Sequence, residues 1–445
     1  MSSDVLVSRA KEAAQSSDWS SLSHYLRRIS VQNALADAAS GRLQEGVRRS
    51  PSPHSSSELS TTEASDNKPE LIRLALYALQ FADFQVRWDI AKLIPSFGSE
   101  AIAPLSQLIE PATEEEDWDL LWFVARILGE FRTEETVQTL RHLMMQVDQP
   151  DLVGIVIQAL ANIGELAIPS LTPLLRDEET RLVAAQTLAQ MNHRAATEIL
   201  IQVSHDENPE VRALAINAIG HLHEPQIREL LTEALADPSA QVRQAAVQGL
   251  GLQVAYLDEQ EFLTQINPLL WDVDLNVRRQ TIQMLGRLHS AAAADALNEA
   301  LHSAYTPEIL KPNVVHGLVW TETEAALRHL QQFVQTTGTS HQFSSSRSSE
   351  GGLESAQIAS SSICCEIAAT LGQVRSSALK PVAAEILTWM LERCAPLKKN
   401  ALLKQKIAFS LGQLALPVAI APLTQLLNDD DLGVRRHAAA ALKMT

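Results

Sequence analysis

The sequence has few aromatic residues, few cysteines and no long uninterrupted hydrophobic run. Aromatic side chains make up 4% of the 445 residues, and there are 17 glycines and 19 prolines. That composition argues against a large β-sandwich or barrel. The three cysteines cannot form a disulfide framework, which favours a reducing compartment. The most apolar run, LLWFVARILGEF, is short and contains Arg126, and the N-terminus lacks a signal-peptide core, so we expect a cytoplasmic location without membrane insertion.

Positive charge is also scarce. There are 36 lysines and arginines against 53 aspartates and glutamates, which gives a formal net charge of −17. This balance argues against a general nucleic-acid binder, whose phosphate contacts need a basic surface. It keeps the chain soluble and biases it towards partners with basic patches. Hydrophobic residues, at 46%, are ample for a buried core.

What the sequence does contain is an internal repeat of roughly thirty residues. DENPEVRALAINAIG, from Asp206, recurs as DPSAQVRQAAVQGLG from Asp237 and as DVDLNVRRQTIQMLG from Asp272. Weaker copies begin near Ala82 and continue to the C-terminus, separated by a second helical pattern such as AIAPLSQLI. Each unit is therefore predicted to be two short helices joined at an Asp-bearing turn. One such pair cannot bury its apolar face alone, so the units must stack into an all-α solenoid.

The repeated pattern resembles a known family. D-x-x-x-x-V-R-x-x-A-x-x-x-L/I-G, found over most of the chain from about Pro69, is similar to the short HEAT repeat, in particular the variety named after phycobilisome lyases. The resemblance implies an α-solenoid of stacked HEAT-like helix pairs, and it fits a cyanobacterial source. We interpret the recurring Arg and Asp of the pattern as a structural ladder of ion pairs and turn hydrogen bonds.

Composition divides the chain into five parts. Two stretches, GRLQEGVRRSPSPHSSSELSTTEASDNK and TTGTSHQFSSSRSSEGGLESAQIASSS, are too rich in serine and charge to bury a core. The second stretch falls between two helices of one unit, so we expect it to bulge from a ridge of the solenoid. The predicted parts are an N-terminal helical cap (1–39), a disordered tether (40–68), a repeat array (69–335), a Ser-rich insertion (336–361) and C-terminal repeat units (362–445).

A candidate binding surface follows from the second helix of each unit. In HEAT solenoids this helix lines the concave side, and the resemblance implies the same here. Two units near the N-terminus then present a tryptophan followed four residues later by a cation, and both residue types are enriched at interface hot spots. The alternative is that the N-terminal helix or other packing covers the two tryptophans. The candidate partner-binding residues are Trp88, Lys92, Trp122, Arg126, Trp118 and Arg279.

Trp118 differs from the other candidates because it lies at the turn before its helix. There it could either stack on the preceding unit or extend the patch.

No catalytic or metal site is predicted. HEAT-like deoxyhypusine hydroxylases carry several His-Glu dipeptides as iron ligands, whereas only His223-Glu224 matches here. His205 and His221 lie at helix ends, and Cys364, Cys365 and Cys394 lack the spacing of a zinc or iron–sulfur ligand set. Phosphate, dinucleotide and acyl-transfer motifs are absent, so no cofactor is expected.

The sequence therefore predicts a non-catalytic solenoid that binds a protein partner along its concave face, as an adaptor or scaffold. Relatives with similar repeats act in phycobilisome turnover or as iron–sulfur assembly adaptors, and the resemblance fits both. One enzymatic alternative stays open. E/F-type phycobilin lyases are HEAT solenoids that attach a phycocyanobilin-type tetrapyrrole to a phycobiliprotein cysteine, and the cluster of Trp88, Lys92, Trp122 and Arg126 has the residue types such a site needs. The oligomeric state is left open.

Overall fold

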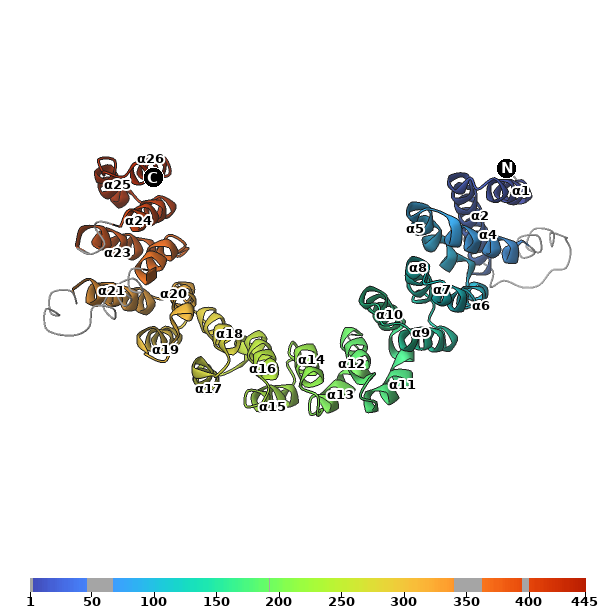
Figure 1. Cartoon of the computed structure of the whole chain (residues 1–445), viewed down its shortest axis with the longest axis horizontal. Coiled ribbons are helices and arrows are strands. Elements are labelled where there is room, and N and C mark those ends of the chain that lie inside the picture. The colour runs from blue at the N-terminus through green and yellow to red at the C-terminus, as the bar shows by residue number, and fades with distance from the viewer. Residues whose placement is uncertain (1–2, 46–66, 192, 340–361, 394–399) are drawn as a thin grey trace. The chain divides into compact units, whose positions relative to one another are not determined.

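The computed structural model describes residues 3–45, 67–191, 193–339, 362–393 and 400–445 (Figure 1). Within these ranges the chain consists of α-helices, short 3-10 helices and turns, with no strand. The predicted all-α class is confirmed. The chain divides into two compact units, Met1–Ala218 and Ile219–Thr445, and each is described by itself.

The first unit is built from short helices. The boundary with the second unit falls after Ala218, inside α14. Its α-helices are α1 (Ser3–Gln15), α2 (Trp19–Glu45), α4 (Lys68–Phe81), α5 (Phe84–Leu93), α6 (Ile102–Ser106), α7 (Ile109–Glu114), α8 (Trp118–Leu128), α9 (Glu134–Gln146), α10 (Pro150–Ile163), α11 (Ile168–Leu171), α12 (Arg181–Gln190), α13 (Arg194–Val203) and α14 (Pro209–Ile219). Its 3-10 helices are η1 (Ile94–Phe97), η2 (Ser99–Ala101), η3 (Gly164–Ala167) and η4 (Thr172–Arg176).

The second unit continues the same design. Its α-helices are α15 (Pro225–Ala234), α16 (Ala240–Gln253), α17 (Glu259–Ile266), α18 (Leu275–Gly286), α19 (Ala291–His302), α20 (Lys311–Trp320), α21 (Glu324–Thr339), an unlabelled helix Ser362–Leu371, α23 (Lys380–Arg393), α24 (Ala401–Leu414), α25 (Ile420–Leu426) and α26 (Leu432–Ala441). Its 3-10 helices are η5 (Val254–Tyr256), η6 (Asn267–Trp271), η7 (Glu308–Leu310) and η10 (Pro417–Ala419).

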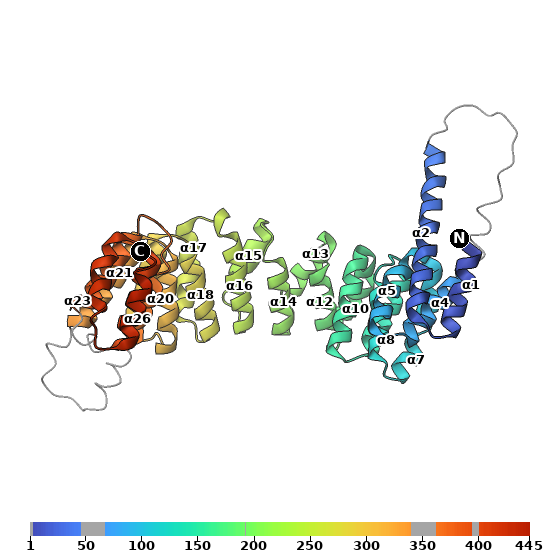
Figure 2. The ribbon, with the colours of Figure 1, turned by 90° about the horizontal axis from the view of Figure 1, so that it is seen from above.

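Helices stack in two rows within each unit. In the first unit α5, α8, α10 and α12 pack one against the next, and α4, α6, α9 and α11 form the other row (Figure 1). In the second unit α16, α18 and α20 pack successively, as α24 and α26 do, opposite α19, α21 and α23 (Figure 1). Figure 2 shows α16 and α18 side by side. Each helix buries one apolar stripe between the rows; α8, for example, fully buries Leu121, Val124, Ala125 and Leu128. This is the stacking that the repeat predicts.

The N-terminal helices dock on the first unit. Leu22, Leu26 and Ile29 of α2 are fully buried, as their helical spacing predicts. Arg27 forms an ion pair with Asp89 of α5 at 3.4 Å. Helix α1 packs on α4, so α1 and α2 form one further helix pair at the start of the two rows.

The Ser-rich parts are only partly described. Helix α2 continues to Glu45 and α4 begins at Lys68, so residues 46–66 of the predicted tether lie outside the described residues. Helix α21 continues to Thr339, and residues 340–361 of the predicted insertion likewise lie outside them.

The recurring Asp and Arg build the turns of the units. The Oδ1 atom of Asp237 accepts a hydrogen bond from the Ser239 amide at 2.7 Å, and Asp206, Asp272 and Asp429 repeat this turn. Arg243, six residues after Asp237, donates to the Asp237 carbonyl at 2.7 Å.

The same arginine also joins neighbouring repeats. Its Nε and Nη2 atoms donate to the two carboxylate oxygens of Asp272, in the next repeat, at 2.7 Å each. Arg181 makes a single such bond, from its Nη1 atom to Asp206 Oδ1 of the next repeat at 3.2 Å. The arginines and aspartates of the repeat therefore hold the stack together.

One run, Pro150–Arg176, is long and apolar enough to cross a membrane by length and composition alone. The structure divides this run. Helix α10 ends at Ile163, because Gly164 adopts a left-handed φ of 79°, and η3, α11 and η4 follow. Helix α10 packs against α8, α9 and α12, so its apolar residues form part of the core.

Candidate functional site

Helices α5 and α8 begin in the same way. The side chain of Asp83 accepts a hydrogen bond from the Val86 amide at 2.9 Å, and that of Asp117 accepts one from the Leu120 amide at 3.0 Å. Both are N-caps, which satisfy backbone donors that a helix leaves free at its start. Because α5 and α8 pack side by side, equivalent positions of two successive helix-pair repeats lie next to each other.

The two tryptophans of these helices meet. The rings of Trp88 and Trp122 have centroids 6.1 Å apart and planes inclined by 23°. The guanidinium carbon of Arg126 lies 4.8 Å from the Trp88 centroid and 5.7 Å from the Trp122 centroid. The ammonium nitrogen of Lys92 lies 5.2 Å from the Trp88 centroid. Four of the predicted residues therefore form one group, held by stacking and cation–π attraction.

Two phenylalanines complete this group, and sequence reasoning missed both. Phe84, one turn before Trp88, stacks on it at 6.2 Å, and Phe123 contacts Phe84 and both tryptophans at 5.2 to 6.4 Å. Phe123 is buried, whereas Phe84 is 62% exposed. The i, i+4 spacing of Phe84 and Trp88 was the signal that could have identified Phe84. We call Phe84, Trp88, Lys92, Trp122, Phe123 and Arg126 the aromatic–cationic cluster.

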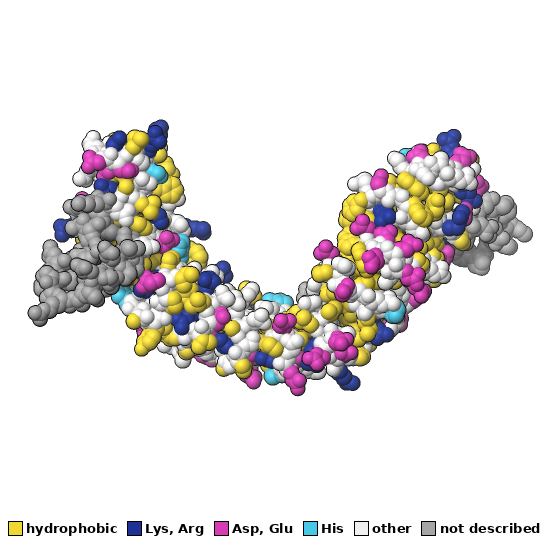
Figure 3. Space-filling view, in the orientation of Figure 1, with side chains coloured by type: hydrophobic (Ala, Val, Ile, Leu, Met, Phe, Trp, Pro, Cys, Tyr) yellow, Lys and Arg dark blue, Asp and Glu magenta, His cyan; other side chains and the backbone are white. Residues whose placement is uncertain are grey.

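The cluster remains open to solvent. Trp122 and Arg126 each follow a member of the buried stripe of α8 by one residue, so they lie at its margin. Trp88 and Trp122 are half-buried, and both cations are exposed. Helix α2 contacts α5 through Asp89 without burying Trp88 completely. In the space-filling view, hydrophobic side chains gather over the part of the first unit that α5 and α8 form (Figure 3).

The other two predicted residues are not part of this cluster. Trp118 is half-buried at the first position of α8, and among the described residues it forms no ring contact with the cluster. Arg279 belongs to α18 in the second unit, where its Nη1 atom donates to Asn276 Oδ1 at 2.9 Å. A partner-binding role for either residue stays a prediction.

Comparison with protein families identifies the repeating unit. Residues 105–189 and 168–251 match the family profile of HEAT repeats. The matched residues are therefore similar to HEAT repeats. The fold is the predicted all-α solenoid of stacked helix pairs.

Likeness to solved structures is distant. A chain of the complex of CpcE and CpcF of phycocyanin lyase from Nostoc sp. PCC7120 is 27% identical, over 33% of this chain and 96% of its own, with a TM-score of 0.29. Human deoxyhypusine hydroxylase is 22% identical over 71% of this chain and 98% of its own, with a TM-score of 0.26. The karyopherin Kap121p, bound to the extreme C-terminus of the protein phosphatase Cdc14p, is 14% identical over 99% of this chain and 54% of its own, with a TM-score of 0.43. These likenesses assign no function to this chain.

A search of the curated proteins finds no match.

Histidine and cysteine side chains are the candidate metal ligands of this chain. Within the described residues, no group of three or more His, Cys, Asp or Glu side chains could hold a metal ion. The ring of His223 lies 4.4 Å from that of Tyr256. Cys364 and Cys365 are buried, and burial raises the pKa of the Cys365 thiol, which keeps it protonated at neutral pH. Cys394 lies outside the described residues.

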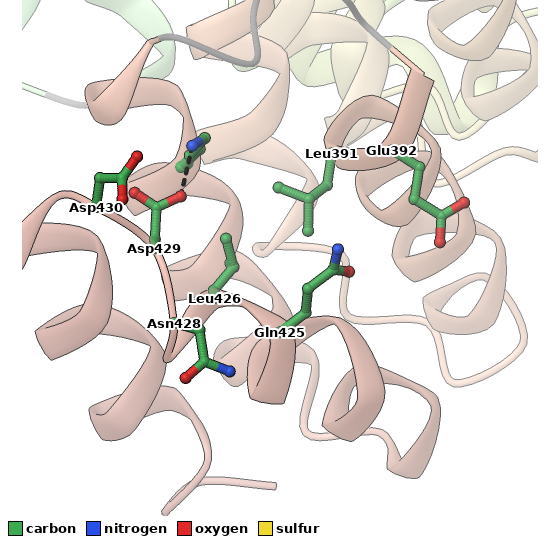
Figure 4. A pocket seen from close by; sticks show the side chains of 8 residues that line it. Leu391, Glu392, Gln425, Leu426, Asn428, Asp429 and Asp430 are labelled. Atoms are coloured by element: carbon green, nitrogen blue, oxygen red, sulfur yellow. Dashed lines mark hydrogen bonds and ion pairs between the residues drawn. The ribbon is translucent and has the colours of Figure 1, made fainter.

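A hollow of about 550 Å³ lies in the second unit. Figure 4 shows Leu391 and Glu392 of α23 on one side, Gln425 and Leu426 of α25 below, and the turn that carries Asp429 on the other. The ammonium of Lys404, which belongs to α24, forms an ion pair with the carboxylate of Asp429 in this turn. The carboxylate of Asp429 is therefore already used to join α24 to the turn before α26.

Acid should weaken this connection. Burial acts to raise the pKa of Asp429, but the hydrogen bonds from Lys404 and the Asp431 amide outweigh it, so the pKa lies below its usual value. A lowered folded-state pKa stabilises the fold above the unfolded-state pKa of about 3.9, and this stabilisation is lost as the pH falls through the folded-state pKa.

We expect Asp429→Asn to be less stable than wild type at pH 7, and the difference to shrink as the pH falls below about 4. Denaturant midpoints followed by circular dichroism across this pH range measure it. Asp430→Asn is the matched control, because it removes the neighbouring, exposed carboxylate. Equal pH profiles for the two variants would contradict the expectation.

Proposed function

We propose that this chain is a non-catalytic HEAT-repeat solenoid that binds another protein through the aromatic–cationic cluster of α5 and α8, as an adaptor or scaffold. The observation that carries the proposal is the stacked pair Trp88 and Trp122 under the exposed guanidinium of Arg126. Tryptophan and arginine are the residues most enriched among interface hot spots, where a few side chains supply most of the binding energy.

The cluster also has the rigidity that recognition needs. Phe123 is buried beneath the two indoles, and both helices are capped and packed in one row. A pre-formed surface loses little conformational entropy when it binds, which favours affinity. The side chains of the cluster offer flat apolar faces, which can pack against a partner's apolar side chains, and two positive charges, which can bind its carboxylates.

The test compares partner capture by three forms of the chain. Wild type, Trp88→Ala/Trp122→Ala and Trp320→Ala are used as baits in native cell extract, and captured proteins are quantified by mass spectrometry. Trp320 is the control because it is a 41% exposed indole on α20, in the second unit. The strongest specific partner is then purified and its Kd measured for each form.

We expect the double variant to bind this partner at least about 30-fold more weakly, which corresponds to a loss of roughly 2 kcal/mol, and Trp320→Ala to bind it normally. All three forms must first show the same helical circular dichroism. Equal affinity of the double variant would refute the proposal, because it would place the binding surface elsewhere.

A bilin lyase or bilin chaperone is the second candidate. The same observation favours it, because indole walls with two cations suit a tetrapyrrole that carries propionates. An absorbance titration with free phycocyanobilin decides between the two. This candidate predicts a red-shifted, saturable complex that Trp122→Ala abolishes, whereas no spectral change would exclude it.

A further inference from the structure

Two cations of the cluster share one indole. The Lys92 ammonium and the Arg126 guanidinium lie 5.2 Å and 4.8 Å from the centroid of the same Trp88 ring. The two charges are therefore at most about 10 Å apart, within the distance over which exposed charges still repel one another at 0.1 M salt.

Among the described residues, neither Lys92 nor Arg126 forms an ion pair, whereas neighbouring cations of the first unit do. Asp89, next to Trp88 in sequence, is paired with Arg27 of α2, and Asp117 lies 3.8 Å from Arg87. The cluster is therefore a positive site on a chain whose net charge is −17.

Next to this positive site lies an apolar surface of defined spacing. Phe84 stacks on Trp88 with centroids 6.2 Å apart, and Trp88 stacks on Trp122 at 6.1 Å, with planes inclined by 22° and 23°. Phe84 is 62% exposed, so this stack offers an apolar face beside the two cations.

We infer that the partner element recognised here is a segment that carries an Asp or Glu together with an apolar side chain. This inference rests on the proposed function of the cluster. The carboxylate binds the Arg126 fork, the Lys92 charge adds to its attraction, and the apolar side chain covers Phe84, whose ring is otherwise exposed. The partner thus supplies the negative charge, although the chain as a whole is acidic.

Peptide selection tests the inference. A random heptapeptide display library is selected on the full-length protein, and an enriched peptide is synthesised together with its Asp→Asn or Glu→Gln form. Fluorescence anisotropy gives Kd for wild type, Lys92→Gln/Arg126→Gln and Arg194→Gln. Arg194 is the charge control because its side chain is 93% exposed on α13, in the same unit.

We expect enriched peptides to carry an acidic residue and at least one of Leu, Ile, Val, Met or Phe. The Kd should rise at least tenfold in Lys92→Gln/Arg126→Gln and at least tenfold for the amide peptide, with no change in Arg194→Gln. Enrichment of peptides without an acidic residue, no enrichment at all, or equal Kd for the acidic and amide peptides would overturn the inference.

The two proposals fail separately. If Trp88→Ala/Trp122→Ala abolishes partner capture but Lys92→Gln/Arg126→Gln does not, the cluster binds its partner without an acidic segment, and only the inference is wrong. If neither double variant affects capture, the proposed function is wrong as well.

Discussion

Replacing Arg243 by methionine is expected to lower the free energy of unfolding of the second unit by about 3–5 kcal/mol. Arg243 donates two hydrogen bonds of 2.7 Å to the carboxylate of Asp272, and the side chains of the pair are only 10% and 6% exposed. The variant leaves the Asp272 charge in this buried place with one backbone partner, the Asp274 amide. Removing one member of a buried pair is costly because the other cannot return to water.

The rest of the loss comes from the turn. The Nη1 atom of Arg243 also donates to the carbonyls of Asp237 and Pro238, at 2.7 and 3.0 Å. Arg243→Lys keeps the charge without the planar fork, so it should lose less stability than the methionine variant. Denaturant unfolding followed by circular dichroism measures each variant.

A double variant separates the uncompensated charge from lost packing. Arg243→Met/Asp272→Asn removes the buried charge and retains an acceptor for the Asp274 amide, so it should be more stable than Arg243→Met alone. If the double variant is equally unstable, or if Arg243→Met costs under about 1 kcal/mol, the pair does not join these units as described.

The second large effect concerns Gly129, where α8 and α10 approach each other closely. A Cβ atom on Gly129, at the end of α8, would lie 2.7 Å from both the Cα and the Cβ atoms of Ala159 in α10. The backbone φ of Gly129 is −64°, which any residue can adopt, so the constraint on this position is steric. Gly129→Ala must push α8 and α10 apart.

We expect Gly129→Ala to lose about 1–3 kcal/mol of stability, the usual cost of overpacking a core. Gly154→Ala is the matched control, because this α10 glycine has nothing within 4 Å of its Cβ position. The control should gain up to about 1 kcal/mol, since alanine favours helix more than glycine does. Thermal unfolding of both variants measures the contrast, and shifts of the same sign would contradict it.

The fold could be predicted because its signals are local and repeated. The Asp-bearing turn and the apolar stripe of each second helix specify a helix pair, and repetition requires the pairs to stack. The same register predicts that Trp88 and Trp122 lie at equivalent positions, four residues before Lys92 and Arg126. Cluster geometry was harder to predict, because the contacts of Phe123 with Phe84 and Trp88 arise only where α5 packs on α8.

Sequence alone determined the all-α class, the HEAT-like unit and the acidic net charge, since each depends on composition or on spacing along the chain. Only the tertiary structure decided that α2 docks on α5 and that Arg126 reaches the Trp88 indole of the preceding repeat. It also decided that Arg279 forms a hydrogen bond with Asn276 of its own helix. The physical reason is that charge and stacking act across short distances in space. A sum of −17 over the chain therefore does not reveal one patch where two cations share a ring.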